Sequence, residues 1–175
     1  MFIFKWLLFF VLLISTPLIF AEVDHEKLGK PAQDLVTQPQ WNLDIAPDGK
    51  GLPHGHGTAA EGEKIYNQQC FACHGPEGMG GSAVALTGDV GSLTDKYPEQ
   101  TVNSYWPYAT TLFDYIRRAM PINAPLSLSA DQVYALCAYI LSRDDIIKKD
   151  AELNEETLPQ VKMPNRDGFI EIYPH

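Results

Sequence analysis

The chain has 175 residues, 45% of them hydrophobic, and its 13 Lys and Arg against 22 Asp and Glu give a net charge of −9. This length indicates one domain, and the hydrophobic content excludes a wholly disordered chain. The acidic balance argues against a nucleic-acid-binding protein, which needs a basic surface, and three cysteines are too few for a disulfide scaffold.

Residues 1–21 have the layout of a secretory signal peptide. Lys5 is their only charge, an unbroken apolar run covers Trp6 to Ile14, and Ala21 ends the segment ahead of acidic residues. A basic start, a short apolar middle and a small residue at the cut are typical of such signals. An uncleaved membrane anchor is the alternative, but Pro17 shortens the run below the roughly 20 apolar residues that a span needs.

Cleavage after this segment would leave a net charge of −10, because the segment carries one positive charge. We therefore expect a periplasmic protein or, if the segment is uncleaved, a membrane-anchored one that faces the periplasm. Residues 22–56 lack periodicity and are predicted to form an extended arm, with Trp41 as its anchor. His54 and His56 lie in a Gly-rich stretch at its end, where an exposed loop is a better interpretation than a metal or haem ligand.

Residues 57–146 are predicted to form the folded domain, and its first helix covers residues 58–69. Thr58 can cap this helix, Glu61 stands three residues later as its partner in a capping box, and Tyr66 belongs to the apolar side. Closely spaced glycines after the helix predict a loop.

Cys70, Cys73 and His74 form the C-x-x-C-H pattern of covalent c-type haem attachment. Two thiols at this spacing can form thioethers with the two vinyl groups on one edge of the porphyrin, and the His that follows is placed to bind the iron. A structural zinc site needs four ligands and a thioredoxin-like pair needs a βαβ context, and neither pattern is present. A plain disulfide is a further alternative in an oxidising compartment, but it leaves His74 unexplained.

The second axial ligand of the iron is predicted to be Met120. It precedes Pro121 in a stretch that prolines keep extended, so its thioether could be pressed onto the distal face. Met79 is too close to His74 in sequence to cross to that face. Met163 is a weaker candidate because it lies in the polar tail, and a His ligand or an open distal site is the remaining alternative.

A middle helix is predicted over residues 110–119. Its apolar face contains Leu112, Phe113, Ile116 and Ala119. Arg117 and Arg118 suit its C-terminus. Either arginine, or Trp106, could bind a haem propionate, and a solvated arginine pair is the alternative.

The last helix is predicted over residues 130–142, after a capping box from Ser129 to Gln132. Cys137 lies on its apolar face and is expected to be a buried small hydrophobe rather than a reactive thiol. Residues 147–175 are predicted to form a tail whose first half is acidic and solvated.

The sequence resembles class I cytochromes c, because Gly62 and Tyr66, with Leu136 and Tyr139, match the positions where the first and last helices of that family cross. It also resembles the SoxD-type cytochrome subunits of sulfur-oxidising dehydrogenases, over nearly all of residues 28–170. The segments that carry this second resemblance are Pro47–Pro53, Ser104–Ile116, Arg118–Pro121, Lys162–Asn165 and Gly168–Phe169.

The resemblance implies an all-α class I cytochrome c fold, with three to four helices around one covalently bound haem c and with extended N- and C-terminal arms. It implies thioethers at Cys70 and Cys73 and axial ligation by His74 and Met120. It further implies an electron-transfer protein rather than an enzyme. Electrons would come from a molybdenum subunit that oxidises sulfane sulfur or sulfite, and would pass to another cytochrome.

Two features depart from the pattern of these relatives. SoxD proteins carry a second haem domain, and no second haem motif is present here. Many class I cytochromes have a Pro before the Leu of the loop after the motif, and the carbonyl of that Pro orients the proximal His. Here Ala85 precedes Leu86, so another carbonyl is expected to make this bond.

Two other hypotheses follow from the same residues. A haem enzyme or sensor, such as a peroxidase or a gas-binding protein, would have an open distal site. An interaction subunit would dock a partner through its acidic surface, which is compatible with electron transfer.

Overall fold

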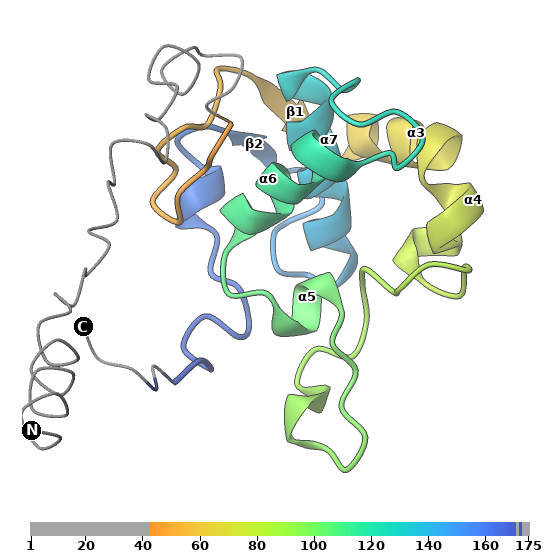
Figure 1. The fold of residues 1–175 in the computed structure, drawn as a ribbon, viewed down its shortest axis with the longest axis vertical. Helices are drawn as coiled ribbons and strands as arrows, with labels where there is room; N and C mark the ends of the chain where they lie inside the picture. Colours follow the sequence, from red (N-terminus) through yellow and green to blue (C-terminus); the bar gives the residue numbers. More distant parts are fainter. Residues whose placement is uncertain (1–42, 171, 173–175) are drawn as a thin grey trace, which may run out of the picture. The chain divides into compact units, whose positions relative to one another are not determined.

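The computed structural model describes residues 43–170 and 172, so Trp41 and the predicted signal segment lie outside the described residues. Within these described residues, five α-helical segments and two short strands follow one another (Figure 1). They are β1 (His56–Thr58), α3 (Ala59–Gln69), α4 (Phe71–His74), α5 (Val102–Tyr105), α6 (Ala109–Ala119), α7 (Ala130–Arg143) and β2 (Glu152–Asn154). Three 3-10 turns complete the described structure: η2 (Pro76–Gly78), η3 (Ser92–Thr94) and η4 (Leu158–Gln160).

The predicted helical class is confirmed, since the described strands form only one short two-stranded sheet. Helices α3, α6 and α7 are the long ones, and α4 and α5 are single turns of four residues each. None of the helices in the described part of the chain is long and apolar enough to cross a membrane.

Local sequence signals set the starts of α3 and α7. The Thr58 side chain accepts a hydrogen bond from the Glu61 backbone N–H, while the Glu61 carboxylate accepts one from the Thr58 N–H at 2.9 Å. Ser129 and Gln132 make the same reciprocal pair at α7. Each capping box satisfies backbone donors that the first helical turn leaves free, as the sequence predicted.

Helices α3 and α7 cross where both backbones come very close. A Cβ on Gly62 would lie 1.9 Å from the carbonyl oxygen of Ala135, so this position has no room for a side chain. One turn further along, the rings of Tyr66 and Tyr139 pack at 5.1 Å between centroids. The family resemblance predicted this crossing at Gly62, Tyr66 and Tyr139, and the structure confirms it.

The core lies between α6 and α7. Leu112, Phe113 and Ile116 are buried on α6, and the Phe113 ring packs against Tyr134 at 4.5 Å. Cys137 is fully buried on α7, and burial raises the pKa of its thiol. It is therefore a small hydrophobe of the core, as expected.

The segment after α7 is packed on the domain to a greater extent than the sequence suggested. Strand β2 pairs antiparallel with β1, with Leu153 opposite Gly57, and both Leu153 and Leu158 are buried. Asp150, Glu152 and Glu156 are exposed as predicted, whereas Glu155 is half-buried. The prediction of a solvated first half was wrong for Glu155 and for these leucines. In this segment apolar and acidic residues are interspersed, so the leucine side chains can be buried while most of the carboxylates face water.

Candidate functional site

A cavity of about 450 Å³ opens between the C-x-x-C-H turn, the loop that follows it, α5, α6 and α7. Its volume is in the range of about 300–1,000 Å³ that small-molecule and cofactor sites occupy. Most of its walls are apolar side chains: Leu86, Val102, Leu112, Ile116, Leu128, Leu136 and Ile140.

The motif forms a single helical turn that faces this cavity. Cys70 lies between the two helices as the C-cap of α3 and the N-cap of α4, and its carbonyl accepts the backbone N–H of His74 at 2.9 Å. Residues three and four apart on a helix share a face, so Cys70, Cys73 and His74 all line the cavity. Cys70 is half-buried and Cys73 is exposed, and neither forms a disulfide with another described cysteine. Burial, with a smaller contribution from Cys73, raises the pKa of the Cys70 thiol to about 11.

The imidazole of His74 is oriented by a backbone carbonyl. Its Nδ1 lies 3.1 Å from the carbonyl oxygen of Val84. Because a carbonyl can only accept, Nδ1 carries the proton, and the lone pair of Nε2 is left for a metal ion. Because Ala85 precedes Leu86, another carbonyl was expected to orient His74. That carbonyl belongs to Val84, two residues before Leu86.

Met120 lines the same cavity. Helix α6 ends at Ala119, and Met120 caps it in an extended conformation, with its N–H donating to the Ile116 carbonyl at 3.0 Å. The other two candidate methionines do not line the cavity: Met79 is 44% exposed, and Met163 is 3% exposed within the hydrophobic core.

Of the three residues considered for a propionate, only Trp106 lines the cavity. Arg118 instead forms ion pairs with Asp114 and Asp44. Lys, Arg, Asp and Glu are all missing from the cavity walls that the described residues make. Sequence reasoning missed the neutral polar residues Gln100 and Asn123 in these walls, because neither belongs to a recognisable motif.

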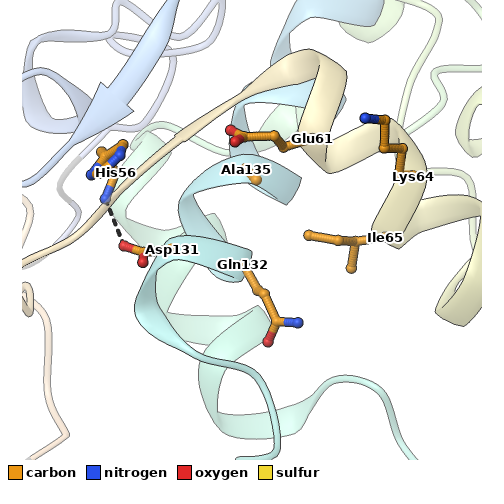
Figure 2. A pocket seen from close by; sticks show the side chains of 7 residues that line it. All are labelled: His56, Glu61, Lys64, Ile65, Asp131, Gln132 and Ala135. Atoms are coloured by element: carbon orange, nitrogen blue, oxygen red, sulfur yellow. Dashed lines mark hydrogen bonds between the residues drawn. The ribbon is translucent and has the colours of Figure 1, made fainter.

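Neither His54 nor His56 lines this cavity. Their side chains are exposed, and His54 Nδ1 lies 2.6 Å from a carboxylate oxygen of Glu155. Figure 2 shows a second, shallow pocket of about 320 Å³, where the His56 N–H donates to Asp131 at 2.9 Å. Within the described ranges, no group of three His, Cys, Asp or Glu side chains could hold a metal ion. The interpretation as an exposed loop holds for His54, whereas His56 is the first residue of strand β1, with its side chain exposed.

In this structure a C-x-x-C-H turn faces an apolar cavity next to two crossed helices. This combination defines the class of c-type cytochromes. The family model described as Cytochrome c matches residues 59–144. The crystal structure of the sulfane dehydrogenase SoxCD from Paracoccus pantotrophus is similar to this chain, at 36% sequence identity and a TM-score of 0.74. The match covers 84% of this chain and 70% of that one. The comparison with curated proteins gave no match.

The chain belongs to the cytochrome c family, whose members bind haem c covalently and transfer electrons. Its cavity fits that cofactor on chemical grounds. Two thiols and an imidazole with a free Nε2 lie on one turn, and a methionine thioether lies in the same cavity. The apolar walls suit a macrocycle that must be kept out of water.

Proposed function

We propose that this protein is a periplasmic, mono-haem electron carrier. It accepts single electrons from a molybdenum-containing dehydrogenase of sulfane sulfur or sulfite and passes them to another cytochrome. The observation that carries the proposal is the presence of Cys70, Cys73, His74 and Met120 around one uncharged cavity. The sulfur substrate class rests on the similarity to a sulfane dehydrogenase.

In this proposal, Cys70 and Cys73 hold the haem through thioethers, and His74 Nε2 and the Met120 sulfur bind its iron. The haem supplies one-electron redox chemistry when bound. Val84 fixes the tautomer of His74 through its carbonyl. The uncharged apolar walls exclude water, which favours the reduced state over a state with an extra positive charge.

The opening of the cavity gives a place where a redox partner could approach. Val84 and Ile122 line the cavity and are 81% and 77% exposed, so they lie at its opening, and half-exposed Tyr115 lies with them. An apolar, uncharged opening would let a partner come close to the haem without desolvating charges.

The ligand assignment can be tested in the oxidised holoprotein by the far-red charge-transfer band of a sulfur–iron bond. We expect the wild type to show this band and Met120→Ala to lose it. Met79→Ala is the matched control, because Met79 is exposed and outside the cavity, and it should keep the band. A band that survives Met120→Ala would overturn the assignment of Met120. Immediate binding of carbon monoxide to the reduced wild type would instead indicate an open distal site.

The partner can be tested by purification of the protein from its native host. Molybdenum should copurify with it, and addition of sulfite or a sulfane sulfur compound to that preparation should reduce the haem. Met120→Ala tests the ligand set in isolation, whereas this experiment tests the donor. A preparation free of molybdenum that neither substrate reduces would contradict the proposed donor.

A further inference from the structure

Residues 83–88, here called the proximal strap, contain the carbonyl that orients His74. The side chain of Val84 is exposed, so its packing does not hold this carbonyl in place. The strap is held instead by hydrogen bonds from outside. Next to Val84, the Ala83 N–H donates to the Cys73 carbonyl at 2.8 Å.

The far end of the strap is held by a carboxylate and by two threonine hydroxyls. Thr87 Oγ1 donates to the Glu77 carbonyl at 2.7 Å, and Thr101 Oγ1 donates to the Gly88 carbonyl at 3.0 Å. Asp144 follows the last residue of α7, and its oxygens accept the Gly88 N–H at 2.8 and 3.1 Å. The same carboxylate accepts the side-chain amide of Asn103 at 2.6 Å. Within the described residues Asp144 forms no ion pair within 4 Å, so these N–H donors are its partners.

Asn103 couples Asp144 to the middle of the strap. Its backbone N–H donates to the Leu86 carbonyl at 3.2 Å, and its Nδ2 donates to both Asp144 and the Ile140 carbonyl, the latter at 2.9 Å. Both partners of Nδ2 are acceptors, which fixes the orientation of the amide. Its Oδ1 is buried without a partner among the described residues, a cost that the two Nδ2 bonds offset.

The position of Asp144 is unfavourable for an isolated helix. A negative charge at a helix C-terminus opposes the helix dipole. A carboxylate kept there accepts charge-assisted hydrogen bonds, which are stronger than neutral ones. Its two donors, Gly88 N–H and Asn103 Nδ2, lie on the proximal strap and α5, so the contacts of this carboxylate are with the elements around His74 rather than with α7.

We propose that Asp144 is a positioning residue that sets the electron donation of His74 to the haem iron. It does so by fixing the proximal strap through Gly88 and Asn103, and thereby the Val84 carbonyl that accepts the His74 Nδ1–H. A firm bond at Nδ1 makes the imidazole more basic and favours the oxidised iron. This inference rests on the proposed ligation of the iron by His74.

The test compares Asp144→Ala with Asp145→Asn in the reduced holoprotein. Asp145 is the next residue and is exposed. The Asp145→Asn variant therefore removes the same charge without removing a contact to the strap. We expect the His74 Nδ1 proton to exchange with solvent about tenfold faster in Asp144→Ala, because the strap opens locally more often. The midpoint potential should rise more in Asp144→Ala than in Asp145→Asn.

Asp144→Asn gives a second, milder variant in case Asp144→Ala does not fold. Its oxygen can still accept the Gly88 N–H, but its amide donors would face those of Asn103, so intermediate values are expected for both readouts. The proposal is overturned if exchange and potential in the Asp144 variants equal those of Asp145→Asn, even when stability is lower. If His74 does not bind the iron at all, the wild type lacks a haem-shifted His74 resonance, which separates that failure from this one.

Discussion

Met120 and Met163 are each followed by a proline, but their surroundings differ. Met120 is half-buried and lines the cavity, whereas Met163 is buried among core side chains. A buried Met is ordinary core filling, and a Met beside a haem site can act as a ligand. The two positions therefore predict different consequences of the same substitution.

Met163→Ala should lower the free energy of unfolding by about 2–5 kcal/mol, since it removes buried atoms and leaves a cavity. It should keep the far-red band of the oxidised holoprotein. Met120→Ala should lose the band with a smaller loss of stability. Guanidinium unfolding of both variants, each followed by its visible spectrum, measures the two effects. Loss of the band in Met163→Ala alone would reverse the assignment of ligand and core residue.

At the scale of residues, the sequence is informative where function requires a particular side chain. Cys70, Cys73 and His74 follow from their spacing, and Met120 follows from its distance to the motif and its prolines. The Val84 carbonyl could not be predicted, because every residue has such an acceptor. The roles of Asp144 and Asn103 could not be predicted either, since only the folded chain brings them to Gly88.

The capping box of α3 predicts a pH dependence of stability. Hydrogen bonds from the Thr58 side chain, and then from its backbone, lower the pKa of the Glu61 carboxyl from its ordinary value of 4.5. A lowered pKa means that the folded state binds its proton less readily than the unfolded state. The stabilisation is therefore complete above about pH 4.5 and is lost as the pH falls through the lowered pKa.

Glu61→Gln should lower the free energy of unfolding at neutral pH. The difference in unfolding free energy between variant and wild type should shrink as the pH falls below about 4.5. Urea unfolding between pH 3 and pH 7 measures this difference. Glu63→Gln, exposed on the same helix and outside the capping box, controls for the loss of one charge. A difference that stays constant over the whole pH range would show that the carboxylate of Glu61 does not support the cap.

The crossing of α3 and α7 predicts a strong effect at Gly62. Alanine in place of glycine raises helix propensity by about 1 kcal/mol, which alone would stabilise α3. The new Cβ would however lie 1.9 Å from the Ala135 carbonyl oxygen and 2.7 Å from the Tyr139 Cβ. Neither atom is the end of a flexible side chain, so the helices must separate.

Gly62→Ala should therefore lower the free energy of unfolding by about 1–3 kcal/mol, since overpacking outweighs propensity. Thermal unfolding of the holoprotein measures the change. Asn67→Ala, at an exposed position of the same helix, should leave the melting temperature nearly unchanged. A more stable Gly62→Ala variant would mean that the two helices can move apart at little cost.

At the scale of elements, capping boxes and apolar periodicity located the long helices to within a residue or two. The pairing of β1 with β2 was not predictable, because strands of three residues are too short to show alternation. The single turn α4 could not be predicted either, because its four residues carry no helix signal of their own. It follows directly after α3 and contains most of the motif.

At the scale of the whole molecule, net charge and local charge differ. The chain carries a net charge of −9, but the described walls of the cavity contain none of the four charged residue types. An acidic surface that docks a partner was one expectation from the sequence. The uncharged opening at Val84 and Ile122 favours apolar contact close to the haem, with charge acting only from a distance.

The combination of a net negative charge with an uncharged cavity opening predicts how small redox reagents react with the reduced holoprotein. An anionic oxidant such as hexacyanoferrate(III) should react faster as salt is added, and a cationic cobalt(III) complex should react more slowly, because the distant negative charges are screened. Both dependences should level off near 0.15 M salt, where the Debye length is about 8 Å. Stopped-flow rates from about 0.01 M upward measure this. A rate with the anion that falls as salt is added would mean that a local positive field at the opening outweighs the net charge of −9.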